Sequence, residues 1–496
     1  MKNIRLYPDI QAAIGTKEKT DFLATVPKVH KVMSAALKQY GSMIEIEQEG
    51  EDFIRPKEPD LFLHAIEDGT ITFKRADTAD TYTPVNMQYR INLGEWQNCL
   101  FTADDNLFTC DISAGQMISF KGDAASLATG TSNYSYFTST CKMNVGGNIM
   151  SLINYNNSME NYCFYGLFKN CTNLISAETL KLPMMELSDY CYAQMFSGCT
   201  GLVTAPVLPA KTLMTHCYNS MFYGCTSLIA APELPATTLS PGSYYEMFSG
   251  CTSIVSAPVI PADVIPGSCC CEMFKNCTSL IYVPDLHMTT IGGSGCYSMF
   301  SGCTSLVNPP AIYAKNMDNR QCCQSMFEGC TSLIAAPELP ATKMVIYCYH
   351  SMFAGCTSLV TAPSILPATE LDYYCYQYMF SGCTSLTTAP VLPATELASH
   401  CYYNMFSGCT SLTTAPELPA ETLVAYCYSY MFSGCTNLSY IKAMFTTTPN
   451  TNTRYSYTNY WVQNVAAEGT FVKNNAAAWT TTGVHGVPEG WNVVTE

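Results

Sequence analysis

The chain has 496 residues, of which 48% are hydrophobic and only 13% are charged, and its formal net charge is −15. This composition excludes a largely disordered chain, which requires low hydrophobicity and high charge. It also argues against a nucleic-acid partner, because phosphate binding needs clustered lysine and arginine, whereas these 24 basic residues form no run. No stretch reaches 18 apolar residues, so we predict no membrane span.

Residues 1–58 are predicted to form a helical leader that attaches the protein to a partner or joins copies of it. Apolar residues recur on one helical face after Pro27, and Gly41 ends the pattern. The expected attachment contacts are Val29, Val32, Met33 and Leu37. Packing of this face on the chain's own β-domain is the alternative. The first residues lack the apolar core of a secretory signal, so export by such a signal is not expected.

Residues 59–150 are predicted to form a small β-sandwich-like domain. Two apolar runs with strand-forming residues, 70–74 and 116–121, are separated by clusters of Asp, Gly and Ser. The segment that ends this range leads directly into a long internal repeat. We therefore expect the domain to cover one open end of that repeat, since end coils must be capped for solubility.

One sequence unit recurs eleven times between residues 161 and 437, with a phenylalanine as its anchor. The anchors are Phe168, Phe196, Phe222, Phe248, Phe274, Phe300, Phe327, Phe353, Phe380, Phe406 and Phe432, spaced by 28 residues once and by 26 or 27 thereafter. A cysteine follows each anchor by three positions: Cys171, Cys199, Cys225, Cys251, Cys277, Cys303, Cys330, Cys356, Cys383, Cys409 and Cys435. A leucine or isoleucine follows by six.

This period predicts a leucine-rich-repeat solenoid over residues 151–440, in a mainly β fold of about eleven coils. A single unit cannot bury its apolar face, but stacked units form continuous interior columns of phenylalanine and cysteine. A proline ten residues after most anchors limits each coil to a short or bulged strand. The Tyr-x-x-Met-Phe segment is expected to form one helical turn that a glycine ends. Residues 441–496, with three tryptophans, are expected to form the C-terminal cap.

The order Met-Phe-x-x-Cys-x-x-Leu, followed by an apolar-Pro strand and then by Cys-Tyr, resembles the BspA-like leucine-rich repeats of bacterial surface proteins. The family pattern has Ala-Phe in place of Met-Phe and a shorter unit. The resemblance implies a solenoid and a non-catalytic adhesin or recognition module. Similar arrays occur in gut bacteria and in their phages.

Sequence motifs for catalysis and for metal binding are missing. The chain contains no P-loop, dinucleotide fingerprint, zincin motif or nucleophile elbow, and its seven histidines are dispersed. We therefore predict no cofactor, no metal and no enzyme activity, with a glycan-active enzyme as a remaining alternative, because paired carboxylates are brought together only by folding. Cys270, Cys296 and Cys323 share one coil position, and we hypothesise that a neighbouring pair could form a disulfide outside a cell.

Candidate binding residues are those that break the repeat while its core stays fixed. They fall in units five to seven and comprise Tyr282, Asp285, His287, Asn308, Tyr313, Lys315, Asn316, Asp318 and Arg320. Polar and aromatic side chains on a rigid surface suit a glycan or protein partner. A tyrosine recurs four residues before the anchor in Tyr192, Tyr218, Tyr349, Tyr376, Tyr402 and Tyr428. We expect these rings to stack structurally, and a sugar-binding platform is the alternative.

Together these features predict a non-catalytic recognition or display protein. The favoured placement is a phage virion, as a fibre or a capsid or tail decoration protein that binds a glycan or protein of the host cell surface. Its leader would then bind a capsid or tail protein, and the protein would be a homo-oligomer, expected to be a trimer. The alternative is a secreted bacterial surface adhesin, located outside the cell or on its surface.

Overall fold

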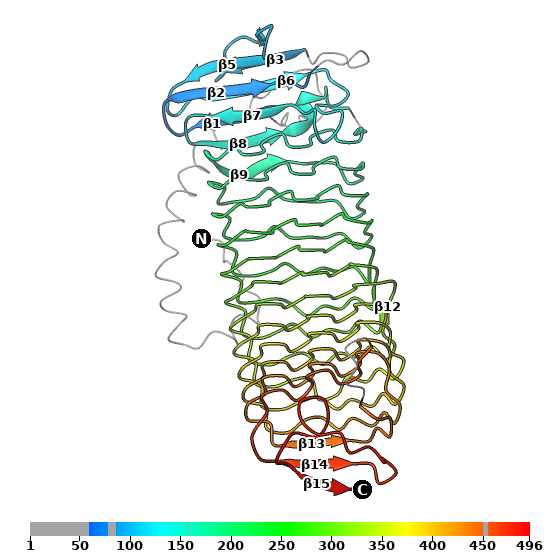
Figure 1. Cartoon of the computed structure of the whole chain (residues 1–496). Coiled ribbons are helices and arrows are strands. Elements are labelled where there is room, and N and C mark those ends of the chain that lie inside the picture. The colour runs from blue at the N-terminus through cyan, green and yellow to red at the C-terminus, as the bar shows by residue number, and fades with distance from the viewer. Residues whose placement is uncertain (1–58, 78–85, 157, 450–454) are drawn as a thin grey trace. The chain divides into compact units, whose positions relative to one another are not determined.

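The computed structural model describes residues 59–77, 86–156, 158–449 and 455–496, and residues 60–496 form one compact unit. This unit is a stack of coils with a β-domain at one end and a three-stranded sheet at the other (Figure 1). The predicted leader, with Val29, Val32, Met33 and Leu37, lies outside the described residues.

Two β-sheets face each other in the N-terminal part of this unit. The strands are β1 (Leu61–Ala65), β2 (Gly69–Lys74), β3 (Met87–Ile91), β4 (Gln97–Asn98), β5 (Leu107–Ile112), β6 (Met117–Gly122), β7 (Tyr136–Ser139) and β8 (Met143–Asn148). Strands β5-β2-β7 form one sheet, and β4-β3-β6-β1-β8 belong to the other. Phe120 of β6 lies 5.0 Å from Phe137 of β7 and 6.3 Å from Phe108 of β5, ring centre to ring centre. These rings join the two sheets in one sandwich-like core.

The larger sheet continues into the first coil. Strand β8 pairs in parallel with β9 (Leu174–Lys181), which follows the first anchor. Between them in the chain lies a short 3₁₀ helix, η1 (Ile149–Leu152), and the Asn148 side chain caps it by accepting the N–H of Met150 at 3.0 Å. The ring of Phe137 stacks on the first anchor, Phe168, at 5.5 Å. The solenoid therefore begins on the core of the β-domain.

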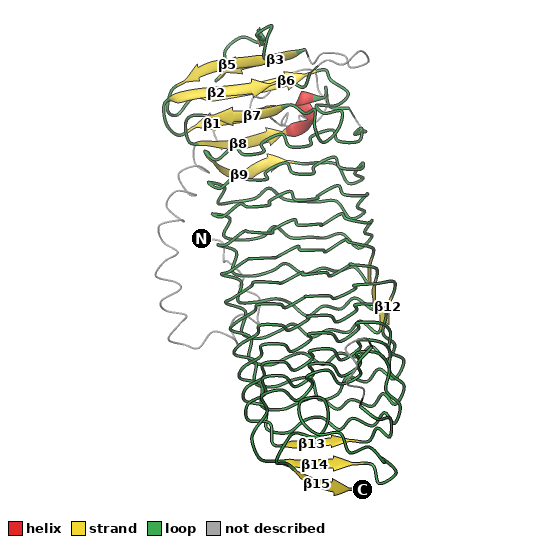
Figure 2. Cartoon of the chain, in the orientation of Figure 1, coloured by secondary structure: helices red, strands yellow, loops and turns green. Residues whose placement is uncertain are grey.

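The eleven anchors form one continuous interior column, as the repeat predicts. Adjacent rings lie 5.3–5.8 Å apart, centre to centre, and are parallel to within 15°. Every anchor is completely buried. The fold is therefore a mainly β solenoid of about eleven coils, and most of its chain consists of turns and short bridges rather than long strands (Figure 2).

The backbone around each anchor is a series of overlapping turns, so the expected helical turn is wrong. The N–H of Phe222 donates to Met247 O in the next coil at 2.9 Å, whereas the N–H of Tyr223 donates back to Ser220 O in its own coil at 3.1 Å. The pattern then repeats at Gly224. In most coils a residue with a positive φ, in the left-handed region, recurs every four positions: six residues before the anchor, two before it and two after it. These residues turn alternate N–H groups toward the next coil, which an α-helix cannot do.

The cysteine that follows each anchor makes a second contact between coils. In ten coils the thiol of this cysteine donates to the backbone oxygen of the anchor one coil earlier, with sulfur–oxygen distances of 2.9–3.1 Å. All of these cysteines are buried. Cysteine is therefore used as a small apolar side chain that also carries a hydrogen-bond donor.

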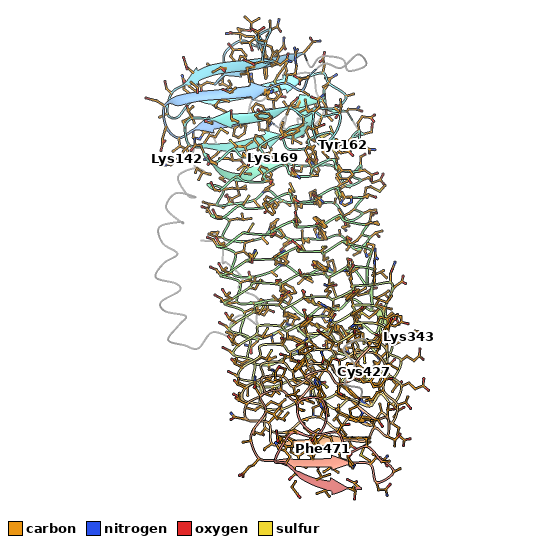
Figure 3. The ribbon with its side chains drawn as sticks, viewed as in Figure 1. Lys142, Tyr162, Lys169, Lys343, Cys427 and Phe471 are labelled. Atoms are coloured by element: carbon orange, nitrogen blue, oxygen red, sulfur yellow. The ribbon has the colours of Figure 1, made fainter. Side chains whose placement is uncertain are left out.

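The described C-terminal residues close the stack with tryptophan side chains. Trp461 lies 6.2 Å from the last anchor, Phe432, and donates from its indole N–H to Gly486 O at 2.9 Å. The strands β13 (Tyr440–Ala443), β14 (Thr470–Lys473) and β15 (Asn492–Thr495) pair in parallel and continue the stacking direction. Phe471 of β14, labelled in Figure 3, is fully buried beneath Trp461.

Candidate functional site

The three coils built on Phe274, Phe300 and Phe327, called the middle coils below, differ from the others in their interior. Elsewhere the residue four positions before the anchor is tyrosine, or phenylalanine in the first coil. Each of these tyrosines is at most 2% exposed, and neighbouring rings lie 5.7–6.3 Å apart, centre to centre. The predicted structural stacking is therefore confirmed, and these rings lie inside the solenoid rather than on its surface. In the middle coils the column is interrupted by Cys270, Cys296 and Cys323, all fully buried.

The surroundings of Cys270, Cys296 and Cys323 keep their thiols protonated and therefore unreactive. All 27 cysteines of the chain are free thiols in the structure. The hydrogen bond that the Cys270 thiol donates to Cys269, together with burial, raises the pKa of Cys270, and burial raises the pKa of Cys296 and of Cys323. Since the thiolate is the nucleophile, these groups do not offer one at neutral pH. Their role in the structure is packing.

The middle coils also differ in their secondary structure. Strands β10 (Val264–Ile265), β11 (Thr290–Ile291) and β12 (Asn316–Met317) pair in parallel just before the three anchors. Met288 is fully buried at a coil position that holds alanine in the neighbouring coils, such as Ala262 and Ala314. The interior of the middle coils therefore differs from that of their neighbours at a second position as well.

A cleft of about 550 Å³ opens on the outer surface of the middle coils. Its polar groups come from Asp285, Tyr313, Lys315 and Glu338, all of them exposed. Its apolar wall comes mainly from Pro309, Pro310, Pro337 and Pro340. The residues from 309 to 315 lead directly into β12, which is labelled in Figure 1.

The structure brings four of the nine predicted binding residues together. Asp285, Tyr313 and Lys315 line the cleft, and the His287 ring stacks on Tyr313 at 5.2 Å with an angle of 15°. The remaining predicted residues do not line it. Tyr282 and Asn308 each lie two residues after the core leucine of their coil, Tyr282 in a bridge with Ser256 and Asn308 in a bend. Asn316 lies in β12, and Asp318 and Arg320 follow that strand. Whether any of the nine binds a ligand stays a prediction.

Sequence reasoning missed Glu338. This residue shares its coil position with Glu233 and Glu417, and the repetition hid its place at the edge of a cleft. The signal that could have found it is the residue at the same position one coil earlier. That residue is Ala311, whose short side chain leaves space between Asp285 and Glu338.

Hydrogen bonds to the next coil hold the two carboxylates in place. Asp285 Oδ1 accepts the N–H of Ala311 at 3.0 Å. Glu338 accepts the N–H of Ser364 at 3.0 Å and its hydroxyl at 2.9 Å. The backbone at Ala311, which also lines the cleft, is fixed in the same way, because the N–H of Leu286 donates to Ala311 O at 2.9 Å. The cleft is therefore preorganised, which lowers the entropy lost when a ligand binds.

The ammonium group in the cleft is available to a ligand. Lys315 takes part in none of the ion pairs found within the described ranges. In the next coil, by contrast, Lys343 forms an ion pair with Glu370 at 3.1 Å; Lys343 is labelled in Figure 3. The cleft thus presents one unengaged ammonium, one phenol and two carboxylates that already hold backbone N–H groups.

No arrangement for a metal ion or a membrane span was found in the described part of the chain. Across these ranges no group of three or more His, Cys, Asp or Glu side chains is placed to hold a metal. Likewise, none of the helices there combines the length and the apolar character needed to cross a bilayer.

Comparisons with known proteins give the family. A comparison with curated proteins and one with solved structures each found no match. The family model described as "BspA type Leucine rich repeat region" matches in six copies, over residues 151–307, 267–404 and 373–476. These matches cover about two thirds of the chain and include the anchor column and the middle coils. The chain therefore belongs to the BspA-type leucine-rich-repeat family, whose members are surface- and adhesion-type repeat proteins.

Proposed function

We propose that the protein is a non-catalytic recognition protein displayed at a surface, and that its ligand binds in the cleft of the middle coils. The observation that carries this proposal is that the cleft lies on coils whose interior anchor column is unbroken. The anchor column runs through Phe274, Phe300 and Phe327 without a break. On the outer surface of the same coils, however, several residues differ from those at the equivalent positions of the other coils, and this surface forms the cleft. A rigid scaffold with a locally altered surface is a common way to position a binding site.

The bonding of the carboxylates supports binding rather than hydrolysis. A glycan-active enzyme needs one carboxyl group as a proton donor and a second as a base or nucleophile. Asp285 and Glu338 flank the cleft, and each uses part of its acceptor capacity to hold a backbone N–H of the following coil in a fixed geometry. They are therefore suited to orient a ligand and to accept its hydrogen bonds.

The surface that carries the protein is expected to be a phage particle, and a bacterial cell surface is the alternative. Proteomics of purified particles against cell-envelope fractions decides between them. Enrichment with capsid and tail proteins would support the virion placement, and enrichment in the envelope would support the adhesin. Mass photometry of the purified full chain tests the expected trimer.

Binding to intact cells tests the role of the cleft. The labelled full chain would be measured on a panel of bacterial strains, alongside the double variant Tyr313→Ala/Lys315→Ala. The matched control is Tyr223→Ala/Lys211→Ala, which removes an exposed tyrosine 46% accessible to solvent and an exposed lysine at the coil position of Lys315. We expect at least a tenfold loss of binding in the first variant and no change in the control. Equal binding by both variants, with intact folding, would refute the proposal.

A further inference from the structure

We propose that the cleft holds a ring of a neutral or amino-bearing sugar and discriminates against sugars that carry carboxylate, sulfate or phosphate groups. This inference rests on the proposed function and goes further, because it names the chemical class of the ligand. It follows from three properties of the cleft: its balance of donors and acceptors, its charge, and its apolar wall.

Hydrogen-bond acceptors outnumber donors in the cleft. An ionised carboxylate has about four lone-pair sites. The bonds to Ala311 and Ser364 occupy only part of the capacity of Asp285 and Glu338. Side-chain donors come from the Lys315 ammonium and the Tyr313 hydroxyl. Four of the ten lining residues are prolines, which have no backbone N–H to donate. A fitting ligand must therefore bring donors of its own, as sugar hydroxyl and amino groups do.

The charge of the cleft disfavours an anion. Two carboxylates face one ammonium, in a chain whose formal net charge is −15. An acidic sugar would place a further negative charge beside groups of the same sign, and it would be repelled on approach as well as when bound. A protonated amino sugar would instead be attracted to Asp285 and Glu338. A neutral hexose would be accepted through hydrogen bonds alone.

The apolar wall fits the carbon–hydrogen face of a sugar ring. Tyr313 is 49% exposed, and its ring stacks on the His287 ring with 5.2 Å between ring centres, a contact that favours one orientation of the phenol ring. Pro309, Pro310, Pro337 and Pro340 surround the cleft with ring carbons that have no rotatable side chain. A site with an apolar wall and a few fixed polar groups is typical of small-molecule recognition, and 550 Å³ lies within the usual range.

An extended peptide is a poorer fit, because the backbone beside the cleft is already paired. Leu286 donates to Ala311 O, Tyr313 donates to Leu286 O, and Lys315 donates to Thr289 O. These bonds join one coil to the next in the manner of a parallel sheet. A peptide that binds by adding a strand needs a free sheet edge, and this part of the surface does not provide one.

Glycan-array binding tests the inference. The probes are neutral and amino sugars on one side, and sialylated, sulfated and phosphorylated sugars on the other. The full chain is compared with Tyr313→Ala and with Asp285→Asn/Glu338→Gln. Glu233→Gln is the matched control, since Glu233 occupies the same coil position outside the cleft. Circular dichroism and a melting curve confirm that each variant is folded.

We expect the wild-type signal on neutral or amino sugars, at least a tenfold loss in Tyr313→Ala, and no loss in Glu233→Gln. The double amide variant should raise the ratio of acidic to neutral binding several-fold, because it removes both negative charges. Binding of acidic sugars by the wild type, abolished in Tyr313→Ala, would overturn the inference but keep the proposed function. Loss of cell binding in the cleft variants without any glycan signal would do the same, in favour of a protein ligand. Cell and glycan binding that no cleft variant alters would refute both.

Discussion

The thiol of Cys303 donates a hydrogen bond to the backbone oxygen of Phe274, one coil earlier, at a sulfur–oxygen distance of 3.1 Å. The same oxygen also accepts the N–H of Cys277 within its own coil at 3.1 Å. The thiol therefore occupies the second acceptor site of a carbonyl that is sealed from water. The same bond recurs in ten of the eleven units, which explains why cysteine rather than alanine occupies this position in those units.

Replacement of Cys303 separates its packing role from its hydrogen bond. Cys303→Ala removes the sulfur and the donor, and it should lower the free energy of unfolding by about 1–2 kcal/mol. Cys303→Ser keeps a donor and should cost less than the alanine variant. Chemical denaturation of the full chain measures both. Equal losses in the two variants would show that the hydrogen bond contributes nothing.

The anchor column predicts a larger loss. Phe300 is fully buried and stacks on Phe274 at 5.8 Å and on Phe327 at 5.6 Å. Phe300→Ala should therefore lower the free energy of unfolding by about 3–5 kcal/mol. Phe101→Ala, at a half-buried ring of the β-domain, is the comparison and should cost clearly less. A near-neutral Phe300→Ala would mean that the coils do not stack in register.

Thiol labelling tests whether the interior cysteines are reduced. Burial raises the pKa of Cys330 and of Cys435 to about 12, so hardly any thiolate forms there at pH 8. Half-buried Cys110 should label first in the native protein, and nearly all others should label only after denaturation. Intact mass should then show 27 labels. A deficit of two after denaturation without reductant would instead support the disulfide hypothesis for Cys270, Cys296 and Cys323.

Partly buried histidines predict lower stability in mild acid. Burial lowers the pKa of His64, His216, His350 and His400 below the ordinary value of 6.5. Between that value and the folded pKa, the unfolded chain binds protons that the native chain does not, so the free energy of unfolding falls as the pH drops below about 6.5. The Tm should be lower at pH 5.5 than at pH 7.5, and His350→Gln should reduce the difference. A Tm that is unchanged or higher at pH 5.5 would contradict this.

Much of the fold could be predicted because it repeats. A side chain that recurs once per coil at a fixed position has only one way to stay buried in a stack, and this argument placed Phe300 and Cys303 correctly. The local backbone could not be predicted in the same way. The left-handed residues are often tyrosine or serine, such as Tyr374 and Ser298, which do not signal a positive φ in the sequence as glycine does.

The candidate site was predictable only in part, because a cleft depends on neighbours in adjacent coils. Asp285, Tyr313 and Lys315 could be identified from the sequence because they differ from the residues at the equivalent positions of other coils. The space between Asp285 and Glu338 arises from the small Ala311 between them, a relation across three coils that a single unit does not show. The residues around Asp318 and Arg320 broke the repeat equally, yet they lie in the turn beyond the cleft.

Restoring the repeat at the cleft tests the account most directly. Most other coils carry proline at the position of Tyr313, and threonine recurs at the position of Lys315, as in Thr289 and Thr342. The variant Tyr313→Pro/Lys315→Thr therefore returns this coil to the common pattern. Binding to cells and the melting curve would be measured on the same full-chain sample. We predict that the Tm is retained within a few degrees while binding is lost. Undiminished binding by this variant would contradict the account.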